Sequence, residues 1–314
     1  MSDQPPADGL HKASLGDWLG LVRFSHTIFA LPFAALATVM AIRTSLPSGE
    51  SVAVRFQDLV GILLCMVTAR SAAMAFNRLV DHKIDAANPR TAKRHLPAGI
   101  LSRRAVAVFT LGCCAAFIAS TAIFLPNRVP IIASIPVLAF LLGYSLAKRF
   151  TSAAHLWLGV ALSLSPVCAW VAIRGASSVE NPSDLLAPCL LALAVAAWVT
   201  GFDIIYACQD AGYDSRVGLH SVPATFGIAG ALRIATVSHV IMLGFLCALP
   251  LVDPRVGFGW LYWVSLVGIV GLVLRQHSLV SPNDLSRVNE AFFQANAWIS
   301  VTLLVVGTID CFWL

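Results

Sequence analysis

The sequence predicts an all-α membrane protein, a bundle of about nine transmembrane helices with a central cavity that opens to the cytoplasm. Apolar residues make up 58% of the 314 residues and charged residues only 12%, with a mean hydropathy of +0.80. Roughly a quarter of the residues of a soluble domain are charged, so a soluble domain is excluded. Apolar segments recur along the whole chain, and because lipid offers the backbone no hydrogen-bond partners, we expect them to be helices.

The apolar segments have about the length needed to cross a bilayer, roughly 20 residues each. They lie near residues 21–42, 57–80, 104–125, 129–147, 154–173, 185–209, 229–251, 257–275 and 290–312. Residues 1–15 are polar, with Pro and Gly, and are expected to form a flexible N-terminal tail. Residues 16–314 are expected to form a single transmembrane domain.

Lys and Arg are concentrated in the loops that follow the second, fourth, sixth and eighth segments. The positive-inside rule therefore places these loops in the cytoplasm. We expect a multi-pass protein of the inner (cytoplasmic) membrane, in contact with membrane lipid. No nucleic-acid-binding motif is present, and the eight cysteines lie in apolar stretches without metal-ligand spacing.

Two acidic runs follow the second and sixth segments, so both are expected on the cytoplasmic side. The first contains Asn77, Asp81 and Asp85, which share one helix face because four residues turn about 400°. In the second, Asp210 and Asp214 share a face, and Asp203 lies close to the same line and about 10 Å deeper. Acids at a membrane interface are often no more than solvated helix ends, but two such runs on one side favour a shared site.

Carboxylates this close together repel one another and need cations. Oxygen ligands suit Mg²⁺, which binds a few carboxylates together with substrate phosphates. The two faces are therefore expected to hold a diphosphate through metal, assisted by basic side chains on the same side. These basic side chains are Arg90, Arg94, Lys148, Arg149 and Arg216, with Lys93 beside them.

Arg70 lies inside the second segment, seven residues before Asn77 and on the same face. An unpaired arginine in a membrane is costly, so we expect it to face the cavity. Two alternatives remain open at this stage. Arg70 either pairs with a buried acid such as Asp203, or it anchors an anionic group of a substrate.

These motifs resemble the UbiA-type intramembrane prenyltransferases, in the branch similar to 4-hydroxybenzoate polyprenyltransferases. The resemblance rests on the two acidic runs and on several flanking segments, and it covers roughly residues 20–310. The flanking segments are Arg23 to Pro32, Ala69 to Arg78, Asn88 to Thr91, Leu96 to Gly99, Tyr144 to Thr151, Gly218 to Pro223, and Phe226-Gly227. Arg78, where many relatives carry a second acid, and His95 before Leu-Pro depart from the family pattern.

The resemblance implies Mg²⁺-dependent transfer of a polyprenyl group from a polyprenyl diphosphate to a ring carbon of an aromatic acid in quinone biosynthesis. It implies 4-hydroxybenzoate as the first candidate acceptor. It assigns the Mg²⁺-diphosphate to Asn77, Asp81, Asp85, Asp210 and Asp214. The remaining roles are hypotheses: Asp203 orients the acceptor or a metal-bound water, Arg23 and Arg70 hold the acceptor carboxylate, and Tyr144 and Tyr206 stabilise an allylic cation or only pack.

Alternatives remain open. Within the family, the acceptor could be a menaquinone-pathway naphthoate-type acid, haem or chlorophyllide. Outside it, a transporter of divalent cations or metabolites would also place acids in a membrane. Transporter charges lie near the bilayer midplane, whereas these acids cluster at one interface, which favours the enzyme.

Overall fold

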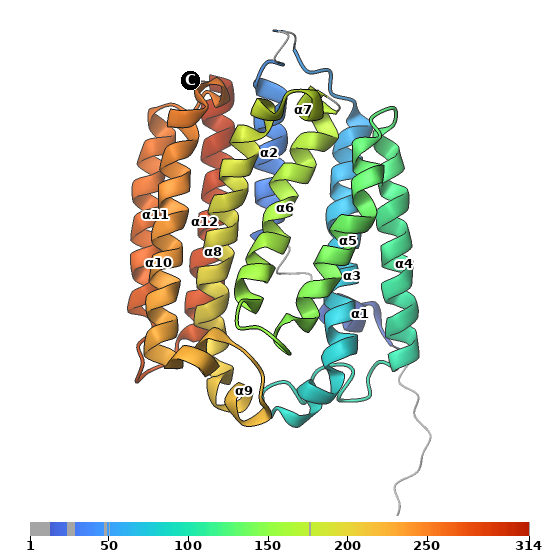
Figure 1. The fold of residues 1–314 in the computed structure, drawn as a ribbon, viewed down its shortest axis with the longest axis vertical. Helices are drawn as coiled ribbons and strands as arrows, with labels where there is room; N and C mark the ends of the chain where they lie inside the picture. The colour runs from blue at the N-terminus through green and yellow to red at the C-terminus, as the bar shows by residue number, and fades with distance from the viewer. Residues whose placement is uncertain (1–12, 24–28, 47–48, 50, 176, 314) are drawn as a thin grey trace, which may run out of the picture.

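The structure is a computed structural model that describes residues 13–23, 29–46, 49, 51–175 and 177–313. These residues form a bundle of long, roughly parallel and antiparallel helices (Figure 1). In chain order the elements are α1 (Leu15–Leu21), α2 (Leu31–Arg43), α3 (Phe56–Ala87), α4 (Arg103–Thr121), η2 (Ala122–Phe124), α5 (Val129–Ala147), α6 (Ala154–Arg174), α7 (Ser177–Glu180), η3 (Pro182–Leu185), α8 (Leu186–Ala207), η4 (Cys208–Asp210), α9 (Ala211–Val217), α10 (Val222–Val252), η5 (Pro254–Val256), α11 (Trp260–Ser278) and α12 (Val288–Trp313). The all-helical prediction is confirmed for the described residues.

Seven helical segments are long and apolar enough to cross a membrane. They are Phe56–Ala87, Arg103–Phe124, Val129–Ala147, Ala154–Arg174, Pro182–Val217, Val222–Val252 and Val288–Phe312. The other two predicted spans are helical but do not reach that standard among the described residues. Helix α2 has only 13 residues, and α11 carries Arg275 and His277 in its last turn. The chain is therefore a multi-pass membrane protein, with seven of the nine predicted spans supported.

Helix α8 is the centre of the bundle, with 67% of its apolar window buried. It packs between α6 and α10, and two glycines allow both close approaches. A Cβ on Gly159 of α6 would lie 2.4 Å from the carbonyl oxygen of Ala196, and one on Gly201 of α8 would lie 2.5 Å from the His239 ring. These contacts fix α8, and with it the second acidic run.

Helix α1 is an element that the sequence analysis did not predict. Ser14 accepts a hydrogen bond from the backbone N–H of Asp17, and Asp17 accepts one from the backbone N–H of Ser14 at 2.8 Å. This capping box starts the helix at Leu15, the last residue of the predicted tail. Residues 1–12 of that tail lie outside the described residues.

One end of the bundle is held by a buried ion pair. Arg174, at the end of α6, donates to both carboxylate oxygens of Asp184 in η3, at 2.6 and 2.7 Å, and both side chains are fully buried. Arg174 also donates to the carbonyl oxygens of Ala41 and Thr44 at the end of α2. The pair therefore ties three chain segments together at the end opposite α9 (Figure 1).

Both acidic runs lie at the other end, as predicted. The first occupies the last turns of α3, which ends at Ala87. The second is not one continuous helix: α8 ends at Ala207, the chain tightens into η4, and α9 begins at Ala211. This break turns α9 across the end of the bundle (Figure 1), toward the loop that follows α3.

Candidate active site

A polar pocket of about 250 Å³ lies at this end of the bundle. It brings together most of the residues singled out from the sequence. Its lining includes Arg23, Asn77, Asp81, Asp85, Arg90, Arg94, Tyr144, Lys148, Arg149, Asp203, Tyr206, Asp210 and Asp214. The prediction that the two acidic faces converge on one cavity is therefore supported by the geometry.

The α3 side of the pocket begins with Asn77 and Asp81. The Asn77 amide donates to Asp81 Oδ2 at 3.0 Å, one turn away on the same helix face. Arg149, in the loop after α5, donates to the other oxygen of Asp81 at 3.1 Å and to the carbonyl oxygen of Val80 at 2.8 Å. The predicted stripe thus forms, and Arg149 lies within contact of it.

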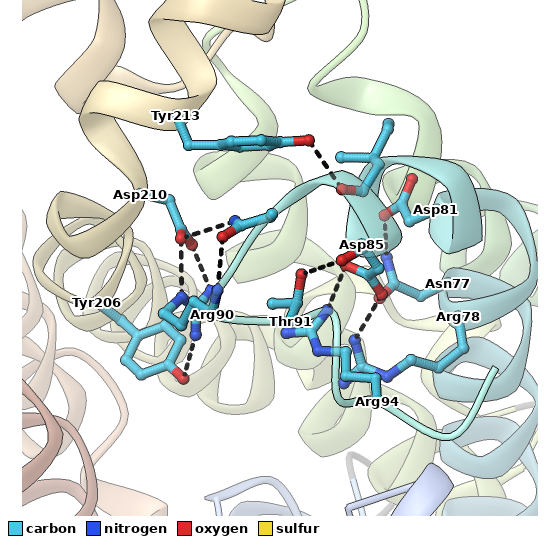
Figure 2. Close-up of polar contacts among 12 residues, drawn as sticks. Asn77, Arg78, Asp81, Asp85, Arg90, Thr91, Arg94, Tyr206, Asp210 and Tyr213 are labelled. Carbon is cyan, nitrogen blue, oxygen red and sulfur yellow. Dashed lines mark hydrogen bonds and ion pairs between the residues drawn. The ribbon is translucent and has the colours of Figure 1, made fainter. Parts of the chain in front are cut away.

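Asp85 is the most enclosed carboxylate of the first run, at 6% exposure. Arg94 donates to its Oδ1 at 2.7 Å, and Arg78 Nη1 lies 3.9 Å from its Oδ2 (Figure 2). Thr91 donates its hydroxyl hydrogen to the backbone carbonyl of Asp85 at 2.9 Å. The loop after α3 therefore folds back onto the helix that precedes it.

The same loop also reaches the second run. Arg90 forms a two-point ion pair with Asp210, with Nε 2.8 Å from Oδ1, and Asn88 donates to Oδ1 at 3.1 Å (Figure 2). Arg90 also donates to the Tyr206 hydroxyl at 3.1 Å and lies 5.4 Å from the centre of its ring. Burial lowers the pKa of the Arg90 guanidinium, but the hydrogen bond and charge of Asp210 outweigh burial and hold that pKa above its ordinary value.

Further bonds join the loops around the pocket. Tyr213 of α9 donates to the carbonyl oxygen of Ile84 at 2.8 Å (Figure 2). The backbone N–H of His220 donates to the carbonyl oxygen of Lys148 at 2.7 Å. Helix α9 is thus joined to α3, and the loop that follows α9 is joined to the loop that follows α5.

Asp203 and Asp214 complete the acidic lining. Asp203 Oδ2 lies 2.6 Å from Nδ1 of His155, which is 1% exposed at the start of α6. Asp214 is 4% exposed, and its Oδ2 is buried with no hydrogen-bond partner among the described residues. The pocket carboxylates therefore differ in partner: guanidinium for Asp81, Asp85 and Asp210, and imidazole for Asp203.

Farther inside the bundle than the polar pocket lies a larger apolar cavity of about 460 Å³. The two spaces share lining residues, so one continues into the other. The shared residues are Met74, Tyr144, Leu158, Asp203 and Phe292. The apolar cavity continues along α5 to Val129, which is about 22 Å from Tyr144 at 1.5 Å per residue. A charged pocket thus joins a long apolar cavity.

Two predicted site residues are placed differently. Arg70 lines the apolar cavity but shows no ion pair with Asp203; it donates to the carbonyl oxygen of Arg23 at 3.3 Å. Its Nε is buried with no hydrogen-bond partner in the described part of the chain. Arg216 lies on the exposed last turn of α9 and is not among the residues that line either space.

Four residues that contribute to the site were not predicted from the sequence. Arg78, Asn88 and Tyr213 lie directly beside the acidic motifs, and their adjacency was an available signal. His155 gave no such signal, because it lies 48 residues from Asp203 and the histidines are scattered along the sequence.

The oxygen atoms of the pocket suit a hard divalent cation that takes further ligands from a second molecule. No group of three His, Cys, Asp or Glu side chains in the described chain is arranged to hold a metal alone. Buried oxygens without hydrogen-bond partners remain on Asp85 (Oδ2) and Asp214 (Oδ2). Mg²⁺ commonly takes one or two carboxylates and completes its shell with water and phosphate oxygens, so these two oxygens suit it.

The structure is a bundle of membrane-spanning helices in which a charged pocket adjoins an apolar cavity. These features define a class of membrane protein that is suited to bind a molecule with a charged head and an apolar tail. Comparison with known proteins makes this specific. The sequence model of the UbiA prenyltransferase family matches residues 26–299. The chain therefore belongs to the UbiA prenyltransferase family, and it is a prenyltransferase.

Individual relatives agree with this assignment. A 4-hydroxybenzoate octaprenyltransferase of Nitrosomonas eutropha is 31% identical over 242 residues, covering 76% of this chain and 79% of that protein. A UbiA homologue from Aeropyrum pernix K1 has a TM-score of 0.78 at 31% identity, covering 91% of this chain and 97% of that one. A homologue from Archaeoglobus fulgidus, bound to DMAPP and Mg²⁺, has a TM-score of 0.63 at 18% identity, covering 95% and 100%, and supports the fold.

Proposed function

We propose that this prenyltransferase moves a polyprenyl group from a polyprenyl diphosphate to a ring carbon of 4-hydroxybenzoate, in quinone biosynthesis. The observation that carries the proposal is the continuity of the charged pocket with the long apolar cavity at Tyr144 and Asp203. A diphosphate head and an isoprenoid tail match these two spaces. The names of the relatives support the acceptor.

The charge of the pocket supports a role for Mg²⁺. The lining carries Asp81, Asp85, Asp203, Asp210 and Asp214 against Arg23, Arg78, Arg90, Arg94, Lys148 and Arg149. These charges nearly cancel, so a diphosphate with several negative charges needs accompanying cations. Asn77, Asp81, Asp85, Asp210 and Asp214 would hold Mg²⁺, which would supply positive charge to the diphosphate leaving group.

The protein's own residues account for the remaining requirements. Arg90, Arg94, Lys148 and Arg149 supply positive charge to the diphosphate. The apolar walls exclude water, which would otherwise capture the allylic cation. Tyr144 lines both spaces and is the better placed ring to stabilise this cation, because the Tyr206 ring already contacts Arg90 and Phe292.

The acceptor is proposed to lie where the two spaces meet. Arg70 lines the apolar cavity, and its buried Nε has no hydrogen-bond partner among the described residues, so it is suited to bind the acceptor carboxylate, with Arg23 of the polar pocket beside it. Asp203 lines the same junction from α8 and is suited to the acceptor hydroxyl. A naphthoate-type acid has the same two groups and remains the second candidate; haem offers no matching hydroxyl.

The proposed location is the inner membrane, with the pocket facing the cytoplasm. The loops at the pocket end carry the excess of Lys and Arg, which the positive-inside rule assigns to the cytoplasm. Water-soluble Mg²⁺ and the aromatic acid would enter from that side. The chain is a prenyltransferase, which rules out the transporter alternative.

The test is product analysis by mass spectrometry with purified protein, Mg²⁺, a set of prenyl diphosphates and either 4-hydroxybenzoate or 1,4-dihydroxy-2-naphthoate. We expect prenylated hydroxybenzoate, and no product once a chelator removes divalent ions. Product only with the naphthoate would transfer the proposal to that acceptor. Undiminished turnover under chelation would refute the metal role.

An alanine variant tests whether the first acidic run takes part in the reaction. Asp81→Ala is expected to abolish transfer, because it removes a carboxylate that lines the pocket. Asp284→Ala is the matched control, since this aspartate is exposed in the loop before α12. Full activity of Asp81→Ala would remove the first acidic run from the mechanism.

A further inference from the structure

His155 is a buried titratable side chain that the proposed chemistry has not yet used. It lies in the first turn of α6, is 1% exposed, and holds Asp203 Oδ2 at 2.6 Å. Its other ring nitrogen, Nε2, is buried with no hydrogen-bond partner in the described part of the chain. A buried N–H without an acceptor is costly, so the imidazole carries its single proton on Nδ1 and donates it to Asp203.

This contact decides which oxygen of Asp203 can act. Oδ2 is occupied by His155, whereas the side chain lines both the polar pocket and the apolar cavity. Oδ1 is thus the oxygen left for a substrate. Asp203 lies within α8, seven residues before Asp210 of η4, so it is farther from the end of the bundle than the second acidic run. At this depth it meets the acceptor ring rather than the leaving group.

We propose that His155 is a positioning residue, which fixes Asp203 so that its free oxygen accepts the hydroxyl proton of a phenolic acceptor. This inference rests on the proposed function. The other paired carboxylates of the pocket are held by guanidinium groups, and a carboxylate neutralised in that way is a weak proton acceptor. A neutral imidazole orients Asp203 through one hydrogen bond and leaves its negative charge in place.

In the proposed step, every proton and every electron pair that moves has a donor and an acceptor. Asp203 takes the hydroxyl proton, and the phenoxide increases electron density at the neighbouring ring carbon. That carbon forms the new C–C bond as the allylic C–O bond breaks, and the bonding electrons leave with the diphosphate. The ring C–H proton then passes to the released diphosphate, and Asp203 returns its proton to the phenoxide oxygen.

The experiment compares His155→Leu with His155→Asn in the full-length protein. Asn places an amide N–H at the same branch as Nδ1, so it keeps the donor, whereas Leu removes it. We expect Leu to lower kcat/KM for 4-hydroxybenzoate by about a hundredfold, the lower end of the range for proton-transfer catalysis. We expect Asn to stay within about threefold of wild type, and both variants to leave the KM for the prenyl diphosphate unchanged, since no diphosphate contact is altered.

A second acceptor separates positioning from a structural role. The hydroxyl of 3-fluoro-4-hydroxybenzoate is more acidic, so it depends less on Asp203, and the defect of His155→Leu relative to wild type should shrink with it. Equal losses in both variants, a raised KM for the prenyl diphosphate, or an unchanged defect with the fluorinated acid would overturn the inference. If wild type transfers to no phenolic acid, the proposed function itself fails; if it transfers and His155→Leu is fully active, only the role of His155 fails.

Discussion

The ion pair between Arg90 and Asp210 leads to a prediction for two ligands, a divalent metal ion and a diphosphate. Removal of the Arg90 charge should change the binding affinities of the two ligands in opposite directions. Without metal, Asp210 is neutralised by Arg90 and by the Asn88 amide. A metal ion that uses Asp210 must therefore displace the guanidinium, and a diphosphate then offers that guanidinium a new partner. Arg90→Met, which keeps the length of the side chain but removes its charge, should tighten metal binding in the absence of diphosphate and weaken diphosphate binding.

The size of the two changes in affinity follows from the burial of the Arg90–Asp210 ion pair. The Arg90 side chain is 29% exposed and that of Asp210 is 12% exposed, so solvent screens the interaction only in part. Hydrogen bonds to charged groups contribute about 1.5–3 kcal/mol. Taking the lower end because of the exposure of Arg90, each effect should be about tenfold in affinity.

The assay is titration with Mn²⁺, followed by electron paramagnetic resonance, on purified protein with and without inorganic diphosphate. Mn²⁺ stands in for Mg²⁺ because both prefer oxygen ligands. Arg216→Met is the matched control, since Arg216 is exposed on α9 and lines neither space. If Arg90→Met leaves Mn²⁺ affinity unchanged or weakens it without diphosphate, the competition between arginine and metal does not exist.

Two further predictions test the rest of the structure. Ala133→Trp should shift the product toward shorter prenyl chains on mass spectrometry, because Ala133 lines the apolar cavity about 16 Å along α5 from Tyr144. Ile132→Trp, at a site that is 73% exposed, should cause no such shift. Equal shifts in both variants would contradict the proposal that the prenyl tail lies in the apolar cavity. Asp184→Ala should lower the stability of the bundle by about 3–5 kcal/mol, since it leaves Arg174 buried without its counter-charge. This loss is measurable as a lower Tm in detergent, and a Tm equal to wild type would show that water or backbone carbonyls replace the carboxylate.

The sequence predicted the site best where residues belong to one helix. The spacing of Asn77, Asp81 and Asp85 on α3 sufficed, because the helical repeat alone sets their common face. The apolar segments likewise predicted the helices, although α2 and α11 fall short of clear spans.

The sequence predicted less where the geometry depends on contacts between elements. The break at Cys208–Asp210 was missed, because a tightened turn has no spacing signature. Arg70 was given an acid as one possible partner, yet Asp203 bonds to His155 on another helix. Arg216 has the right charge at the right end, but its side chain is exposed.

The bonds from Asn88 and Arg90 to Asp210 span 122 and 120 residues of sequence. Each acidic run therefore belongs to a different half of the polypeptide, and the halves are joined through the short connection between α6 and α8. Neither half carries a complete reaction centre by itself. During synthesis, the two acidic runs can therefore meet only after α8 and α9 have been made and have docked against α3, so a chain that ends before α8 lacks half of the charged pocket.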